Sequence, residues 1–354
     1  MSNAITSTHC FYLRASESPT YYNISKHLQQ QGWRSASPNQ PSHFGEQHFD
    51  FHLPAAECLE FKNLLSNLVS QYCPEVMPRT YCINDQNWPL VLNQVADECY
   101  SQWNPHSQNN SLSDHPGHPI WILKPAHLNN GRHIKIFQNL AQLEQHYLSS
   151  NRLGGEQVLQ RYLTDPHLLK GPEKGHKYSI RMFVVITNYA EAYLYPEGYF
   201  NIALNPYQKD DFTDLRPHLT NEYLKKDEYN VVQIPTQRYD LFKPLYPKIK
   251  EIVSAIVNAL QKQFPDASVC ENENQRKLAI CGFDFMVDSD MRVWLLEVNH
   301  GPCFPTSDEH PLQKVLYHDF WQSVVTSFVL PIGMGKPSED IHYQRFEVVN
   351  GRSS

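Results

Sequence analysis

Long apolar runs separated by short polar breaks characterise the last third of the chain. Apolar residues dominate positions 279–287 and 291–298, and a polar stretch, 288–290, separates the two runs. Runs of this length, rich in aromatic and aliphatic residues, are typical of buried strands, and a short polar break between them indicates a turn. The pattern predicts a buried β-hairpin, around which the rest of the chain is organised.

Three polar residues interrupt this apolar hairpin. Glu297 and Asn299 are two positions apart, so they share one face of a strand, and pairing across the turn can bring Asp284 beside them. Two carboxylates and an amide oxygen suit a hard cation such as Mg²⁺, whereas uncompensated carboxylates are costly to bury. A simpler interpretation is that the carboxylates face water. The apolar flanks favour a magnesium site with a bound phosphate, for which this trio provides the metal ligands.

Periodicity and turn residues predict the remaining elements. Helical spacing of apolar residues predicts helices over 19–31, 59–69, 88–103, 142–149, 243–264 and 312–330. Short apolar runs predict strands over 9–14, 120–125, 156–163 and 177–187, and a hairpin made by 190–196 and 199–204 around Glu197 and Gly198. The polar stretch 104–119 is expected to be a mobile loop. We expect a small N-terminal α/β domain (1–75), a central domain (76–188), a C-terminal domain (189–336) and a peripheral tail (337–354).

Two of the predicted strands carry cations on otherwise apolar backgrounds. Lys124 ends one strand and precedes a polar turn, so the turn can cover a polyphosphate or can be an ordinary exposed hairpin. The sequence lacks the glycine-lysine pattern of a Walker loop at this position. Lys177, Ser179 and Arg181 share one face of the long strand, which favours an anionic ligand over a structural salt bridge.

Bulk composition narrows the class of protein. Charged residues make up 19% of the chain and the formal net charge is −7, so no basic excess indicates nucleic-acid binding. The eight cysteines form no Cys-x-x-Cys pair, which argues against a zinc site. The N-terminus lacks the pattern of a signal peptide and no run approaches the length of a membrane span. We therefore expect a cytoplasmic protein without a membrane or nucleic-acid partner.

A series of short motifs resembles the tubulin–tyrosine ligase and tubulin ligase-like family. The resemblance covers about residues 120–330, and the motifs occur in the family's order at 121–125, 160–163, 177–181, 193–198, 218–221, 282–288 and 294–299. The N-terminal segment also looks like the start of the tyrosine ligase. Each motif alone is weak, whereas the ordered set is specific.

The resemblance implies an ATP-grasp fold of the α/β class, with ATP held between two sheets. It also implies an ATP- and Mg²⁺-dependent ligase that joins a free amino acid to a protein or peptide carboxylate, such as a tubulin-like tail, through an acyl phosphate. The roles carried over are catalytic for Arg181, Glu297, His218 and Asn221, and nucleotide-binding for Lys124, Gln160, Tyr162, Leu163, Lys177, Ser179, Arg181 and Asp284. Asp284, Glu297 and Asn299 would hold the magnesium.

Several positions depart from the family pattern. Ser179 stands where the family usually has aspartate, the turn at 130–133 has less glycine, and Pro196 and Asn201 replace arginines. Nucleotide and magnesium binding are still expected, whereas the substrate is open. Two alternatives therefore stand beside the protein ligase: a nucleotide-binding pseudoenzyme that acts as an interaction module, and an ATP-grasp ligase for a small molecule.

Overall fold

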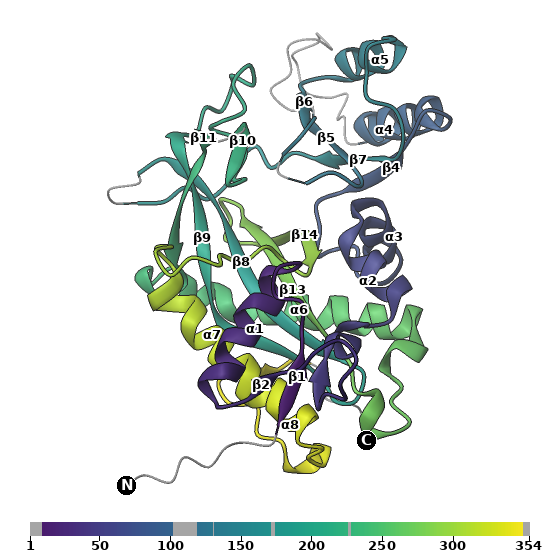
Figure 1. Cartoon of the computed structure of the whole chain (residues 1–354). Helices are drawn as coiled ribbons and strands as arrows, with labels where there is room; N and C mark the ends of the chain where they lie inside the picture. Colours follow the sequence, from purple (N-terminus) through teal and green to yellow (C-terminus); the bar gives the residue numbers. More distant parts are fainter. Residues whose placement is uncertain (1–8, 102–118, 130, 171–173, 226–227, 350–354) are drawn as a thin grey trace, which may run out of the picture.

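The computed structural model describes residues 9–101, 119–129, 131–170, 174–225 and 228–349. Two sheets dominate this part of the chain, and Figure 1 shows the smaller one above the end of the larger one. Almost all of the stretch 104–119, which we expected to be a mobile loop, lies outside the described residues.

The larger sheet has the strand order β12-β9-β8-β13-β14, with β15 added to β9. Its strands are β8 (His176–Thr187), β9 (Ala192–Pro206), β12 (Val231–Pro235), β13 (Leu278–Val287), β14 (Val293–His300) and β15 (Glu347–Val348). The predicted hairpin is confirmed, because β13 and β14 pair antiparallel. Its second strand begins two residues later than predicted, since Met291 has a φ of 62° and belongs to the turn.

Side chains alternate between the two faces of this sheet. On β8, Ile180, Met182 and Val184 pack into one core with α6 (Phe242–Gln263), whereas Phe183 and Val185 pack into a second core on the other face. The second core contains the C-terminal helical run, which also confirms the predicted helix there: η5 (Gln313–Tyr317), α7 (His318–Val324), η6 (Val325–Val329) and α8 (Leu330–Gly333).

The prediction of a hairpin around Glu197 and Gly198 is wrong. A single strand, β9, runs through both residues and pairs with β8, and the register shifts between Met182 and Val184. The shift is a bulge, which bends the strand without reversing it. Gly198 fits there because it has no side chain: a Cβ atom would lie 2.0 Å from the carbonyl oxygen of Arg181.

The smaller sheet has the order β4-β7-β5-β6 and is covered by two helices, whose core includes Trp121, Leu123 and Leu159. Its elements are β4 (Thr80–Ile83), α4 (Trp88–Ser101), β5 (Trp121–Pro125), β6 (Lys135–Phe137), α5 (Leu140–Leu148) and β7 (Gln157–Arg161). The antiparallel β5–β6 pair confirms the strand–turn–strand predicted after Lys124.

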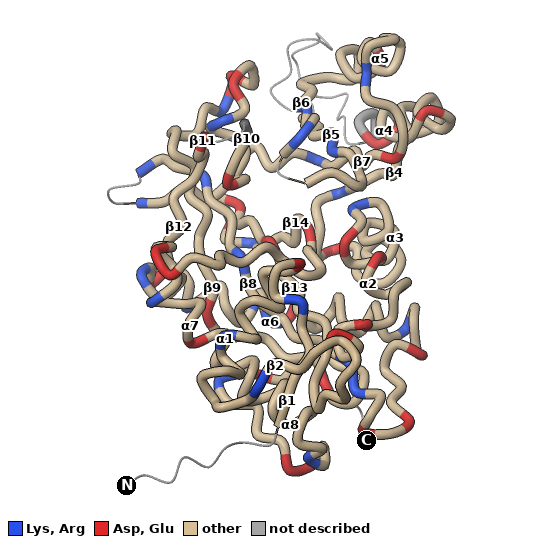
Figure 2. The backbone as a smooth tube through the Cα atoms, in the orientation of Figure 1, with Lys and Arg blue, Asp and Glu red and all other residues tan. Residues whose placement is uncertain are grey.

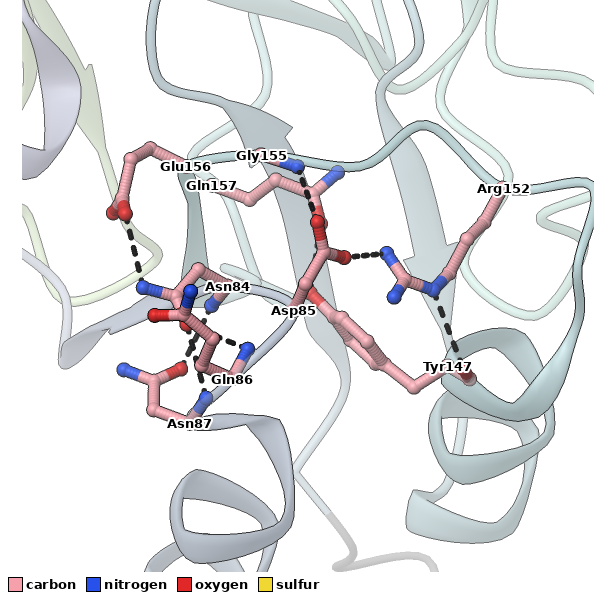
Figure 3. A network of polar contacts seen from close by, with 9 residues as sticks. All are labelled: Asn84, Asp85, Gln86, Asn87, Tyr147, Arg152, Gly155, Glu156 and Gln157. Atoms are coloured by element: carbon pink, nitrogen blue, oxygen red, sulfur yellow. Dashed lines mark hydrogen bonds and ion pairs between the residues drawn. The ribbon is translucent and has the colours of Figure 1, made fainter.

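A network of polar contacts fastens the loop before β7 to the start of α4 (Figure 3). Asp85 pairs with Arg152 and accepts a hydrogen bond of 2.9 Å from the backbone N–H of Gly155. The amide of Asn84 donates to Glu156 at 2.9 Å. The Arg152 guanidinium also lies 5.0 Å from the ring centre of Tyr147. These contacts fix the loop that leads into a strand of the pocket described below.

The N-terminal segment forms a three-stranded sheet and several helices. Its elements are β1 (Cys10–Tyr12), α1 (Pro19–Gln30), β2 (Arg34–Ser35), β3 (Phe44–Gly45), η1 (Glu46–Phe49), α2 (Leu53–Glu60) and α3 (Lys62–Tyr72). The single helix predicted over 59–69 is wrong, because Phe61 has an extended backbone, with ψ of 122°, and separates α2 from α3. Residues of β1 and α1 share a core with the C-terminal helical run, and α3 contacts α6. The domain boundaries stay a prediction.

The remaining elements connect or border these layers. They are β10 (Tyr223–Lys225), β11 (Glu228–Tyr229), η2 (Thr236–Arg238), η3 (Pro265–Ser268), η4 (Glu273–Gln275) and η7 (Ser338–Asp340). β10 and β11 form a small separate hairpin that lies near the smaller sheet in Figure 1.

Candidate functional site

A pocket of about 280 Å³ is lined by residues of both sheets. Every site residue predicted from the sequence lines it: Lys124, Gln160, Tyr162, Leu163, Lys177, Ser179, Arg181, His218, Asn221, Asp284, Glu297 and Asn299. Figure 2 shows basic and acidic positions close together at the junction of the sheets. The residues are therefore gathered as expected, while their chemical roles stay predictions.

A β-bulge sets which side chains of the hairpin face this pocket. Asp284 pairs with Glu297, but Phe285 pairs with Leu295, so Leu296 is the extra residue. Leu295 consequently packs into the core under α6, although it is two residues from Glu297. Without the bulge these two side chains would share a face, because strand side chains alternate. The bulge allows the sequence to place a carboxylate in the pocket and a leucine in the core.

Arg181 and Asp284 form a buried bidentate ion pair across β8 and β13. The guanidinium Nε and Nη2 atoms donate to the two carboxylate oxygens at 2.6 Å each. Burial raises the pKa of Asp284 to about 6, and the guanidinium opposes that rise. Gly282 makes room for the pair, since a Cβ atom there would lie 2.9 Å from Nη1 of Arg181. Asn299 adds a hydrogen bond of 3.1 Å from its Nδ2 to Asp284.

Glu297 is the second carboxylate, and cations surround it. Its Oε2 lies 3.5 Å from Nζ of Lys62, the first residue of α3. Burial alone would raise the pKa of Glu297, but Lys62, Lys124 and Arg181 together lower it to about 2. Glu297 is therefore ionised at neutral pH and is available as a ligand for a cation.

Two buried lysines stand on the pocket wall without a carboxylate partner. Nζ of Lys124 donates to Oε1 of Gln160 at 2.7 Å, and Nζ of Lys177 donates to the hydroxyl of Tyr162 at 2.8 Å. Neither lysine forms an ion pair with another described residue. Burial is the main cause that lowers their pKa values, to about 8 for Lys124 and about 7 for Lys177. Buried cations in this state favour an anionic ligand, which would compensate their desolvation.

Tyr162 connects Lys177 to His218. The hydroxyl of Tyr162 lies 2.8 Å from Nδ1 of His218, and Nε2 of His218 lies 2.7 Å from the carbonyl oxygen of Asp211. Burial lowers the pKa of His218, so the neutral ring donates from Nε2 to the carbonyl and accepts at Nδ1. Both ring nitrogens are thus engaged, and His218 orients the tyrosine that holds the lysine.

Ser179 and Asn201 occupy the positions where the sequence departs from the family. They pair across β8 and β9, and Nε2 of Gln233 on β12 donates to Oδ1 of Asn201 at 3.1 Å. All three line the pocket. This part of the wall is therefore neutral and polar.

The sequence matches a known protein family over most of its length. The sequence profile of the tubulin-tyrosine ligase family matches residues 51–337. The chain belongs to the tubulin-tyrosine ligase family. The resemblance inferred from the motifs is confirmed, and so is the mixed α/β, ATP-grasp-like fold.

Relatives within the tubulin-tyrosine ligase family are named for two modifications. Tubulin glycylase 3D of Tetrahymena thermophila is 25% identical over 70% of this chain and 23% of its own length. The probable tubulin polyglutamylase ttll-9 of Caenorhabditis elegans is 24% identical over 58% of this chain and 52% of its own. Tubulin polyglutamylase TTLL6 of Mus musculus is 23% identical over 75% of this chain and 33% of its own length. The chain thus spans about a quarter of the length of the first of these relatives.

The residue types of this family member fit a magnesium ion. No group of three or more His, Cys, Asp and Glu side chains gathers into a metal site within the described ranges. The predicted set is of another kind, two carboxylates and an amide, and such oxygen donors suit Mg²⁺, which keeps several waters and binds through one or two carboxylates. The directly paired Asp284 and Glu297 provide this donor chemistry.

Sequence reasoning missed several residues of the site. Tyr199, Glu222, Met286, Leu296 and Cys303 also line the pocket. Glu222 directly follows the motif 218–221, so its neighbourhood could have suggested it. Lys62 gave no signal, because its helix appeared continuous with the one before it.

No helix in the part of the chain that the structure describes is long and apolar enough to cross a membrane.

Proposed function

We propose that this chain is an ATP- and Mg²⁺-dependent carboxylate–amine ligase that adds an amino acid to a protein carboxylate. One observation carries the proposal: two buried lysines that form no ion pair with another described residue line the same pocket as two carboxylates, the buried Asp284 and the half-buried Glu297. The lysines suit a polyphosphate, and the carboxylates suit the metal that accompanies it.

The chain's own residues would bind and orient the reactants. Lys124 and Lys177 hold phosphate oxygens, and Tyr162 keeps the Lys177 ammonium in place. Nε and one N–H of Nη2 of Arg181 bind Asp284, so its remaining N–H groups would donate to oxygens of the transferred phosphoryl group and stabilise their negative charge. The acceptor carboxylate takes the γ-phosphoryl group to give an acyl phosphate, and the amine then displaces phosphate.

Asp284, Glu297 and Asn299 would hold the magnesium. The metal would neutralise charge on the phosphates. Because Arg181 binds both oxygens of Asp284, this carboxylate would serve the guanidinium and a bound metal together. Glu297 is the freer of the two carboxylates, since its contact with Lys62 is 3.5 Å long.

The names of the relatives suggest the substrates. Glycylases and polyglutamylases of tubulin indicate glycine and glutamate as donors and tubulin as the acceptor. The neutral wall around Asn201, in place of an arginine, favours a donor or acceptor segment without a negative charge at that position.

The experiment incubates the full chain with ATP, Mg²⁺, purified tubulin and labelled glycine or glutamate. Wild-type protein should label tubulin and release ADP, and Glu297→Gln should lose the label, while Glu309→Gln, at an exposed site, should keep it. If neither glycine nor glutamate labels tubulin, the proposal is contradicted. Tight binding of an ATP analogue without ADP release would then favour the pseudoenzyme, and ADP release stimulated by small carboxylates would favour a small-molecule ligase.

A further inference from the structure

Glu222 is a pocket carboxylate that the proposed nucleotide and magnesium contacts do not use. It lies between β9 and β10, directly after Asn221, and lines the same pocket as the lysines and the acidic pair. Its backbone carbonyl accepts a hydrogen bond of 2.8 Å from the N–H of Asn230, which fixes this segment. The side chain is half-buried.

The groups around Glu222 come from three other elements. Arg181 of β8, Tyr199 of β9 and Tyr317 of η5 interact with it electrostatically, and the hydroxyl of the adjacent Tyr223 lowers its pKa. Arg181 is committed to Asp284 at 2.6 Å. Among the described residues, no cation forms an ion pair with Glu222. A further cation in the pocket would therefore find this carboxylate available.

We propose that Glu222 binds the α-ammonium group of the incoming amino acid and accepts a proton from it. The inference rests on the function proposed above and assigns the residue that prepares the nucleophile. The amino acid arrives with a charged amino group, which has no lone pair for attack, so a base must remove one proton first. The carboxylate attracts the ammonium and takes that proton.

The bonds and protons of this step balance. After one proton passes to Glu222, the amine nitrogen attacks the carbonyl carbon of the acyl phosphate and the C–N bond forms. The bond between that carbon and the phosphate oxygen breaks, and its electron pair leaves with phosphate. The nitrogen loses its second proton to the departing phosphate, and Glu222 returns its proton to water. The products are the amide and inorganic phosphate.

The other pocket carboxylates are poorer bases. The surrounding cations lower the pKa of Glu297 to about 2 despite its burial. Burial raises the pKa of Asp284, but both of its oxygens accept hydrogen bonds from Arg181, which leaves it poorly placed to take a proton from an amine. Burial raises the pKa of Glu222 above its ordinary value, which brings it closer to the working pH. A base is most effective when its pKa lies near that pH.

Hydroxylamine separates an action on the incoming amine from an action on phosphoryl transfer or on the fold. It is a neutral nucleophile at pH 7.5, so it captures an acyl phosphate as a hydroxamate without prior deprotonation. The full chain is incubated with ATP, Mg²⁺ and tubulin in two separate reactions. One contains labelled glycine or labelled glutamate, and the other contains hydroxylamine in place of the amino acid. Glu222→Gln should lose amide formation by about 100-fold or more, the usual contribution of a general base, and should form hydroxamate at the wild-type rate.

Two further variants control the comparison. Glu222→Asp keeps the carboxylate and should restore part of the amide formation, whereas Glu228→Gln, at an exposed position on β11, should leave both reactions unchanged. Full amide formation by Glu222→Gln overturns the inference. An equal loss of amide and hydroxamate also overturns it, because the residue would then act on phosphoryl transfer or structure. Absence of hydroxamate with wild-type protein overturns the proposed function itself, and this inference with it.

Discussion

Binding of a nucleotide should consume protons, because the two buried lysines lose theirs near neutral pH. The pKa is about 7 for Lys177 and about 8 for Lys124, with burial as the main cause. At pH 8 the free protein therefore carries a proton on Lys177 in roughly one molecule in ten and on Lys124 in about half. Phosphate oxygens favour the charged ammonium, so both lysines should be protonated in the complex.

The size of the effect follows from these pKa values. Binding should take up roughly 0.6 protons at pH 7 and roughly 1.4 at pH 8, and the dissociation constant should rise about tenfold between the two. The uptake is positive and grows with pH, because the two lysines of the free protein lose protons as the pH rises and must regain them when the nucleotide binds. The phosphate group itself titrates near pH 6, below this window.

Calorimetry with a non-hydrolysable ATP analogue and excess Mg²⁺ measures this proton uptake. Titrations at each pH are run in two buffers with different ionisation enthalpies, and the difference in heat gives the number of protons. Lys177→Met should remove most of the uptake at pH 8, and Lys170→Met, at an exposed position outside the pocket, should not. Proton uptake that is the same at both pH values, or the same in Lys177→Met, would refute the reasoning.

Three further predictions concern binding and stability. Gly198→Ala should destabilise the protein by about 3 kcal/mol, because its Cβ would meet the Arg181 carbonyl at 2.0 Å; thermal unfolding checks this, with Gly154→Ala as the milder control. Arg181→Lys should weaken analogue binding about tenfold, measured by calorimetry, since one ammonium cannot replace a bidentate donor. Asp85→Ala should speed amide hydrogen exchange across residues 149–156, because Arg152 and the Gly155 N–H lose their partner. The free energy of unfolding should fall by less than about 1 kcal/mol. Unchanged exchange would contradict this prediction.

Much of the site could be predicted because its signals are local. Asp284 and Glu297 belong to adjacent strands joined by a short turn, so the hairpin pattern predicts that they lie close together, whereas their direct pairing also needs the bulge at Leu296. Lys177 and Arg181 share a face because strand side chains alternate. Such inferences need only a short window of sequence.

The remainder depended on long-range or irregular structure. The pairing of Arg181 with Asp284 requires that β8 lie beside β13, and more than a hundred residues separate the two positions in the chain. The bulge at Leu296 depends on the partner strand, which a single strand's pattern does not reveal. The turn signal of Glu197 and Gly198 was misleading, because a glycine that admits a close backbone contact looks the same as one that forms a turn.

The charges around the pocket give a reason for magnesium to accompany the nucleotide. Lys62, Arg161, Arg181 and the two buried lysines carry five positive charges when all are protonated, and Asp284, Glu297 and Glu222 carry three negative charges. The excess is small, and partial deprotonation of Lys177 near pH 7 reduces it further. A free triphosphate brings more negative charge than this excess can offset, and it would also face the ionised Glu297. A divalent cation held by the acidic pair removes both penalties at once, so the affinity for the nucleotide should depend on the metal before any chemistry takes place.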